Sequence, residues 1–282
     1  MTVAVVTDST ACLPTYRVEQ AKIAVVPVHV VIGDRVYNEG IDITPFAVTT
    51  ALNEGREVTT SKPSPEAFAN VYRQMAFQGA TEIVSVHLSS ELSGTYSSAV
   101  LAAREARIPV RVIDSRTIGL GLGFATLAAA DAALAGHEID DVAETALRIG
   151  RASRVWLYVD TLEYLRRGGR IGTAQAAVGS ALSIKPILEI AGGRVVPCDK
   201  VRTASRAQQR LVELAVEAAS ALGNRVEIGV QHAGARAAAE TLSVALGKAL
   251  PGIPVVLAEM GAVLAVHAGP GALAVVVSPL HQ

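Results

Sequence analysis

Ser93, Gly94 and Thr95 combine two hydroxyl groups with a glycine where a strand pattern gives way to a helix pattern. We expect all three residues at the first positions of that helix, where backbone N–H groups are free and the helix dipole is positive. Small side chains there let a ligand approach, so a carboxylate or a phosphate could bind. Taken alone, the segment is explained more simply by a Ser93 that caps its own helix.

A second hydroxyl-rich segment ends at Thr60 and Ser61 and is followed by two prolines. The prolines fix the backbone, and we expect Ser64 to cap a helix that has Pro65 in its first turn. The simpler interpretation of this segment is a solvated loop.

His267 lies between two apolar stretches and precedes a stiff Gly-Pro-Gly turn at residues 269–271. A single histidine near apolar residues is more often structural than functional. This turn, however, is too tight and polar for a core packing position, so His267 is a candidate for the same site.

A concentrated basic turn contains Arg166, Arg167 and Arg170. Arg170 lies between glycines and an isoleucine, where its planar guanidinium could fold inward to support a carboxylate site. For Arg166 and Arg167 a solvated basic loop is an equally good explanation. Arg202 is expected on the surface, at a rim or in a docking patch.

The composition indicates a folded, aliphatic protein. The chain of 282 residues is long enough for two packed domains, and its 50% hydrophobic and 18% charged residues indicate that it folds. Aromatic residues make up 4% and the net charge is -1, so binding to nucleic acid is not expected. Cys12 and Cys198 form no metal-binding or redox motif, and the first residues predict a strand rather than a signal peptide. The cytoplasm is therefore the expected compartment.

The apolar runs at residues 3–6, 83–86 and 110–113 each end in polar residues and lead into a helical pattern. Such repeats are typical of a parallel α/β sheet, in which ligands bind at the carboxyl ends of the strands. Residues 25–32 and 35–38 flank a Gly-Asp pair and predict a hairpin.

The pattern changes near residue 153, where we place a boundary between domains at residues 1–153 and 154–282. Later strands are joined partly by tight turns, and long amphipathic helices at residues 205–222 and 236–250 would cover one face. The expected fold class is α/β with two domains. An N-terminal parallel-sheet α/β domain would carry the hydroxyl and glycine anion site. A C-terminal α+β domain with a largely antiparallel sheet would complete the site between the domains.

Residues 260–282 contain no acidic or basic side chain except His267 and His281, and they are long enough to resemble a membrane span. The Gly-Pro-Gly break and a β-branched run at residues 275–277 predict strand, turn and strand instead. We expect no transmembrane helix.

Common catalytic motifs are missing. Gly119, Gly121 and Gly123 lie where a dinucleotide fingerprint would, but Phe124 occupies a position that requires a small residue. Close packing of a helix against the sheet is the expected role of these glycines. The sequence has no phosphate loop, nucleophile elbow or zinc protease motif, and its histidines show no ligand spacing. We therefore expect no catalytic residue, cofactor or metal.

Six motifs, taken together, resemble the DegV family of bacterial fatty-acid-binding proteins. They lie in order at residues 6–10, 39–43, 60–64, 88–95, 165–171 and 267–271. Lys62 stands where the family more often has glutamine, which changes the charge at the entrance but leaves both neighbouring hydroxyls in place.

The resemblance implies a two-domain α/β protein that sequesters one long-chain fatty acid between its domains. It also implies a partner, a separate ATP-dependent fatty-acid kinase that converts the presented carboxylate to an acyl phosphate for phospholipid synthesis. By motif position, Thr60 and Ser93 would hydrogen-bond the carboxylate, and Arg170 and His267 would form the network around it. Such a carrier is not itself an enzyme, and transient membrane contact for lipid exchange is compatible with it.

From the geometry of the segments we add Ser61 and the backbone amides of Gly94 and Thr95 to the groups that would bind the carboxylate. The apolar segments that could line the acyl tunnel are residues 118–130, 173–184 and 260–266.

Two other classes of function remain open from the residues alone. An α/β enzyme could bind a phosphorylated or carboxylated metabolite at residues 93–95 and use His267 as a general acid or base. A ligand-free interaction module would explain the basic residues but not the convergent hydroxyls. The identity of a copurifying ligand would distinguish the three classes.

Overall fold

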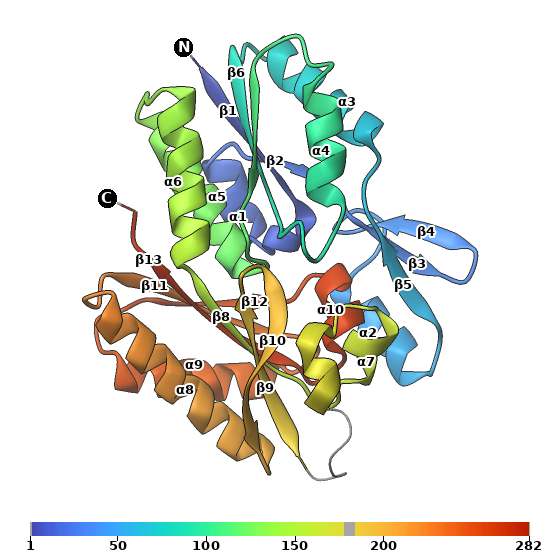
Figure 1. Ribbon diagram of the computed structural model, residues 1–282, viewed down its shortest axis with the longest axis vertical. Helices are drawn as coiled ribbons and strands as arrows, with labels where there is room; N and C mark the ends of the chain where they lie inside the picture. Colours follow the sequence, from blue (N-terminus) through green and yellow to red (C-terminus); the bar gives the residue numbers. More distant parts are fainter. Residues whose placement is uncertain (1, 178–183, 282) are drawn as a thin grey trace.

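The computed structural model describes residues 2–177 and 184–281, which form three β-sheets joined by helices (Figure 1). The first sheet is parallel and has the strand order β2-β1-β6-β7. Its strands are β1 (Val3–Asp8), β2 (Ala24–Val26), β6 (Glu82–His87) and β7 (Val110–Asp114). The helices around it are α1 (Thr15–Gln20), α3 (Pro65–Phe77), α4 (Thr95–Ala103), α5 (Leu120–Leu134) and α6 (Ile139–Ala152), with a 3-10 turn at Ser9–Ala11.

Helices cover both faces of this parallel sheet (Figure 1). Neighbouring side chains of a strand point to opposite faces, so Val6 of β1 packs in one core with Phe68 of α3, and Val5 packs in another with Leu122 of α5. As expected, Ser64 caps α3 by accepting a hydrogen bond from the N–H of Ala67 at 3.2 Å.

The second sheet has six strands in the order β10-β9-β8-β13-β11-β12. All of its pairs are antiparallel except β11 with β12. The strands are β8 (Arg154–Tyr158), β9 (Lys185–Ala191), β10 (Arg194–Val201), β11 (Val226–His232), β12 (Val255–Glu259) and β13 (Leu273–Pro279). One face is covered by the two expected amphipathic helices, α8 (Ala204–Ala221) and α9 (Arg236–Ala249). The prediction of an α/β protein with a parallel N-terminal sheet and a mostly antiparallel C-terminal sheet is confirmed.

Helix α5 lies between the two large sheets and contacts β1 on one side and β13 and β11 on the other. Because it is enclosed, residues 120–130 are buried around the whole circumference rather than along one stripe, and the exposed Asp131 comes only in the last part of the helix. Its glycines permit the close packing that the sequence suggested. A Cβ on Gly121 would lie 3.1 Å from Val155 of β8, and a Cβ on Gly123 would lie 2.7 Å from the carbonyl oxygen of Ala11.

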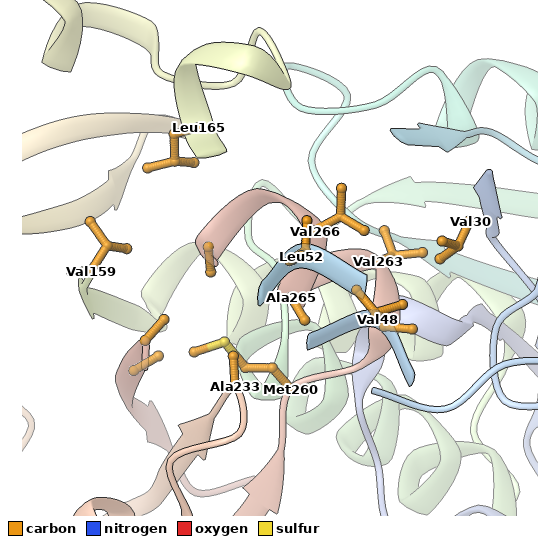
Figure 2. Close-up of a cluster of buried hydrophobic side chains, with 14 of the residues drawn as sticks. Val30, Val48, Leu52, Val159, Leu165, Ala233, Met260, Val263, Ala265 and Val266 are labelled. Carbon is orange, nitrogen blue, oxygen red and sulfur yellow. The ribbon is translucent and has the colours of Figure 1, made fainter. Parts of the chain in front are cut away.

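The third sheet is small and antiparallel, with the order β4-β3-β5. Its strands are β3 (His29–Ile32), β4 (Arg35–Asn38) and β5 (Val58–Ser61), and α2 (Pro45–Asn53) and α10 (Ala262–Ala268) pack against it. Figure 2 shows Val48 and Leu52 of α2 beside Val263 and Val266 of α10, with Val30 of β3 next to them. Residues from the first part of the chain therefore share a core with residues more than 200 positions later. The remaining short helices are α7 (Glu163–Arg167) and a 3-10 segment at Gly172–Ala177.

The hairpin prediction for residues 25–32 is wrong in its first half. The hairpin itself exists, because β3 and β4 pair across Gly33 and Asp34. Val25 and Val26, however, belong to β2 and pair in parallel with Thr7 and Asp8. Pro27, which has no N–H for a ladder, separates the two strands.

The prediction of strand, turn and strand for residues 260–282 is also wrong in its first part. Ala262–Ala268 is the helix α10, and only β13 after the turn is a strand. The buried residues of α10 are Ala262, Val263, Ala265, Val266 and Ala268, a spacing that puts most of them on one face of a helix. Among the described residues no helix is long and apolar enough to cross a membrane.

The boundary expected at residue 153 stays a prediction. Helix α6 ends at Ala152 and β8 begins at Arg154, so the second sheet does start there. The third sheet comes from the range 1–153, yet it packs on α10 of the range 154–282.

Candidate functional site

A cavity lies on the face of the six-stranded sheet that α8 and α9 leave uncovered. It holds about 1070 Å³ of space free of atoms, including the open solvent at its mouth. The strands contribute Val155, Leu157, Ile190, Val195, Gln231 and Ala274. Loops and helices contribute the aliphatic residues Leu88, Leu92, Ile118, Met260, Val263 and Leu264. Most of the wall is therefore saturated hydrocarbon.

The strand register explains why these residues share one face. Val195 lies opposite Ile190, and Leu157 lies opposite both Leu188 and Ala274. Ala274 in turn lies opposite Gln231. Because side chains alternate along each strand, the lining crosses the sheet from β10 to β11 on the side that faces α5.

One end of the cavity is polar, and Thr60 and His267 meet there. The Nε2 atom of His267 lies 2.8 Å from the hydroxyl oxygen of Thr60. Thr60 is carried by β5 and His267 by the last turn of α10, so the packing of the third sheet on α10 brings them together. The imidazole also lies against Gly168, where a Cβ would come 2.1 Å from Nδ1.

The pKa of His267 is lowered to about 4, mainly by burial and to a smaller extent by the nearby positive charge of Arg170. The ring is therefore neutral at pH 7 and carries a single N–H. Its Nδ1 atom is buried and has no hydrogen-bond partner among the described residues. The neutral ring serves better as a hydrogen-bonding group than as a general acid at this pH.

Ser93, Gly94 and Thr95 form the second polar wall, in a geometry that differs from the expected one. Helix α4 begins at Thr95 with Gly94 as its N-cap, so Ser93 precedes the helix and the expectation that it occupies a first helical position is wrong. The Ser93 oxygen accepts a hydrogen bond from the N–H of Thr95 at 3.3 Å and lies 2.8 Å from the Thr95 hydroxyl. Ser93 and Gly94 line the cavity, whereas Thr95 is fully buried behind them.

Two cations border this polar end. Arg170 is folded inward, and its guanidinium donates to the carbonyl of Leu92 at 3.0 Å and to that of Gly168 at 2.6 Å. Lys62 lies across Gly94, where a Cβ would be 3.2 Å from the ammonium nitrogen. Lys62 has no hydrogen-bond or ion-pair partner in the described part of the chain, and no described lining residue is acidic. The polar end can therefore neutralise an anion.

The predicted site residues are brought together by the fold. Six of the seven, all except Thr95, line the cavity; they are Thr60, Ser61, Ser93, Gly94, Arg170 and His267. Ser61 is exposed at the mouth, with its hydroxyl 3.4 Å from Nδ1 of His29. Whether these groups bind a ligand stays a prediction.

The predicted tunnel segments contribute less than expected. Only Ile118 and Gly119 of residues 118–130 line the cavity, while residues 260–266 supply Met260, Val263 and Leu264. No described residue of the segment 173–184 lines it, and residues 178–183 lie outside the described residues.

A second cleft adjoins the polar end from another side. Thr60, Arg170 and His267 border both spaces, and the second cleft is also lined by Arg56 and Arg167. Arg166 and Arg167 pair with Glu163 at 2.7 Å on the surface of α7. The polar groups are therefore reached from a cleft whose described lining has three arginines and one acidic residue, Glu57.

Glu39 anchors the helix that carries His267. Its carboxyl group accepts a hydrogen bond from the N–H of Val263 at 2.8 Å and another from the Ser9 hydroxyl. Ser9 in turn accepts from the N–H of Val28 at 2.9 Å. Burial raises the pKa of Glu39 to about 7. The motifs at residues 6–10 and 39–43 thus meet and form an internal polar support for α10.

Among the described residues no cluster of three or more His, Cys, Asp or Glu side chains is arranged to hold a metal ion.

Comparison with known proteins gives one consistent family. The family model of DegV, described as an uncharacterised protein family, matches residues 2–280. A DegV domain-containing protein from Streptomyces coelicolor is 50% identical over 277 residues, covering 98% of each chain. Two solved structures are also similar. A DegV family protein from Thermus thermophilus, described with fatty acid binding, has a TM-score of 0.92 and 35% identity, with 99% of this chain and 100% of that chain covered. DegV from Bacillus subtilis, described as a fatty acid binding protein, has a TM-score of 0.91 and 33% identity at the same coverage.

Proposed function

The chain belongs to the DegV family, and from this membership and the shape of its cavity we propose that it binds one long-chain fatty acid. The observation that carries the proposal is the polarity of the cavity, which is aliphatic along the sheet and has hydroxyls, an imidazole and two cations at one end. The acyl chain would lie along the sheet, with the carboxylate between Thr60 and Ser93.

The hydrogen bonds at the polar end suit a carboxylate, which only accepts. If the neutral His267 ring donates from Nε2 to the Thr60 oxygen, the Thr60 proton is free for the ligand. In the same way a Thr95 hydroxyl that donates to Ser93 leaves the Ser93 proton free. Each ligand-facing hydroxyl is thus backed by a second group that holds it in a donating orientation. Lys62 and Arg170 would supply the compensating charge.

The tail would supply most of the binding free energy. Each buried methylene contributes about 0.8 kcal/mol, so a chain of about 16 carbons gives a gross term on the order of 10 kcal/mol before the cost of ordering it. The head group then fixes orientation, because a carboxylate moved from water into the protein needs hydrogen bonds and charge to offset its desolvation.

Denaturing extraction of freshly purified protein, followed by lipid mass spectrometry, tests the proposal. We expect one long-chain fatty acid per chain. The control is a variant in which Ala274, on the apolar wall, is replaced by aspartate, because a buried carboxylate there should abolish lipid content. A copurified phosphorylated metabolite would instead favour an enzyme, and the absence of lipid, with no binding of added fatty acid, would refute the proposal.

We further propose that the bound acid is presented to a separate ATP-dependent fatty-acid kinase, which forms the acyl phosphate used in phospholipid synthesis. The second cleft supports this idea, since it reaches Thr60, Arg170 and His267 from outside while the tail would stay covered. A phosphate donor must approach the carboxylate closely and in line. In this proposal the chain acts as a carrier in the cytoplasm, performs no catalysis, and contacts membranes only transiently for lipid exchange. Phosphorylation of the bound acid by the cognate kinase, with none by the chain alone, is the expected result.

A further inference from the structure

Gln231 is the polar lining residue that lies away from the carboxylate-binding end. The described lining residues of this sheet come from the five strands β10, β9, β8, β13 and β11, in that order. Gln231 lies on β11 at one edge of this set, and Val195 lies on β10 at the other edge. Four strand spacings separate the two strands, which amounts to roughly 19 Å. Arg170 is two residues from Gly172, where a Cβ would contact the carbonyl oxygen of Val195 at 2.5 Å. The charged end is therefore at the β10 side and Gln231 is at the opposite side.

The Gln231 side chain is held in one position. Its Oε1 atom accepts a hydrogen bond from the N–H of Leu120 at 2.9 Å, which satisfies a free donor at the start of α5. Gly119 has a φ of 62°, and a Cβ there would lie 2.5 Å from Oε1. Only 2% of Gln231 is exposed. A polar residue at the end of an apolar cavity is thus explained by its role as a cap for α5.

Beyond Gln231 lies a different cleft. The Nε2 atom of Gln231 is buried and has no hydrogen-bond partner among the described residues. Cys12 lies near the Gln231 side chain and lines a surface cleft together with Leu13, Thr15 and Glu39. Gln231 is in the lining of the acyl cavity but not of this cleft, and Cys12 is in the lining of the cleft but not of the cavity. The two spaces share no described lining residue, and Gln231 and Cys12 are neighbours from the two sides.

From this geometry we infer that Gln231 is the end wall of the acyl cavity and sets the longest acyl chain that the protein binds. The inference rests on the proposed binding of a fatty acid. A chain that reaches the wall gains affinity with each buried methylene, roughly fourfold per carbon. A longer chain has to fold back or leave its carboxylate out of position, so affinity falls beyond that length. With Gln231 shortened, the tail extends toward Cys12 and the cleft.

The test measures binding of saturated fatty acids of increasing length, from 12 to 24 carbons, to delipidated protein. In Gln231→Ala we expect the length of maximal affinity to rise by two or more carbons. Gln231→Met is the matched control, because it keeps the length of the side chain but loses the α5 cap, and its optimum should stay that of the unmodified protein even if it is less stable. Ala274→Val, next to Gln231 in the same cross-strand row, should shift the optimum to shorter chains and keeps the test decisive if Gln231→Ala does not fold.

An unchanged length optimum in folded Gln231→Ala, or in Ala274→Val, would overturn the role of Gln231. An optimum that shifts equally in Gln231→Met would also overturn it, since loss of the cap rather than of the wall would then be responsible. If the unmodified protein binds no fatty acid of any length, the proposed function itself fails, and the two failures are thereby distinguished.

Discussion

The Nε2 atom of His267 lies 2.8 Å from the Thr60 hydroxyl oxygen, although the two residues are 207 positions apart. Because the pKa of His267 is lowered to about 4, the ring is a neutral donor or acceptor over the physiological pH range. The contact gives the Thr60 hydroxyl a fixed orientation, and the contribution of this hydroxyl to fatty-acid affinity can be measured.

Replacing Thr60 with valine keeps the shape of the side chain and removes its hydroxyl. A hydrogen bond to a charged acceptor contributes about 1.5 to 3 kcal/mol, so affinity for a fatty acid should fall roughly 10- to 150-fold. The fatty alcohol of the same length is the control, because its neutral head group should lose much less affinity. Isothermal titration of both ligands checks this, and equal losses for the two would count against a carboxylate at Thr60.

His267→Ala should also weaken fatty-acid binding, but through Thr60 rather than by direct contact. We therefore expect the double variant Thr60→Val/His267→Ala to bind about as well as Thr60→Val alone. A double-mutant cycle on the same titrations gives the coupling. Fully additive losses would show that His267 acts independently of Thr60.

Gly168→Ala should abolish the geometry of the polar end while leaving the fold intact. The new Cβ would lie 2.1 Å from Nδ1 of His267, and a ring packed in α10 cannot move away without breaking the contact with Thr60. Gly247→Ala is the control, since a Cβ there meets nothing within 4 Å and replaces glycine inside a helix. In the first variant we expect fatty-acid affinity to fall by about as much as in His267→Ala, and in the second we expect full binding with up to about 1 kcal/mol of added stability. Unchanged fatty-acid affinity in Gly168→Ala would exclude a role for the ring position.

Because the pKa of Glu39 is raised in the folded state, the free energy of unfolding should decrease as pH rises from 4.5 to 7. This pKa is about 7 in the folded state and 4.5 for an ordinary glutamate, so in this window the unfolded chain releases a proton that the folded chain retains. The loss is at most about 3 kcal/mol. His267, whose folded pKa is lowered, has the opposite effect between about 4 and 6.5, because its unfolded form takes up a proton as pH falls.

Glu39→Gln isolates the contribution of this carboxyl group. In denaturant unfolding of both proteins, the free energy of unfolding of the glutamine variant relative to the unmodified protein should increase as pH rises to about 7. Above pH 7 the folded carboxyl is also ionised, so the difference should then stay constant. A pH-independent difference would mean that Glu39 is ionised in the folded protein.

Arg167 lines the cleft that leads to the polar end, and Arg166 is its neighbour on α7, so reversing both to glutamate should slow acyl phosphate formation by the cognate kinase and flatten its salt dependence. Fatty-acid content should not change, because these side chains do not line the acyl cavity. Arg202→Glu is expected to act in the same direction. Arg236→Glu on α9 is the matched control, since it also breaks a surface ion pair, with Glu240, but lies on the covered face of the large sheet. Unchanged kinetics in the first two variants would place the kinase elsewhere.

Local sequence patterns were sufficient to predict the apolar strands of the parallel sheet. The runs at residues 3–6, 83–86 and 110–113 became β1, β6 and β7, since apolar strands followed by helices have few alternatives. Residues 260–268 were assigned to the wrong element because alanine and valine fit a buried helix as well as a strand. Packing against α2, α7 and the third sheet decided the matter.

Six of the residues at the polar end of the cavity could be named from the sequence, because hydroxyl, glycine and arginine residues form recognisable short motifs. The tunnel could not be located, since Leu157, Ile190 and Gln231 line it only through the strand register across the sheet. A glutamine in an apolar strand gave one usable signal, as a buried amide there requires a partner. That partner, the N–H of Leu120, is 111 positions away and was not predictable.

The packing of the third sheet on α10 has a consequence for synthesis of the chain. At roughly 5 to 20 residues per second, a ribosome that has just added Thr60 needs about 10 to 40 s to reach His267. During that interval β5 lacks the helix on which it packs, and its apolar neighbours Val30 and Val48 have no cover from α10. An unfinished chain therefore cannot hold a fatty acid in the proposed way, and it exposes an apolar surface that a chaperone could shield until α10 emerges.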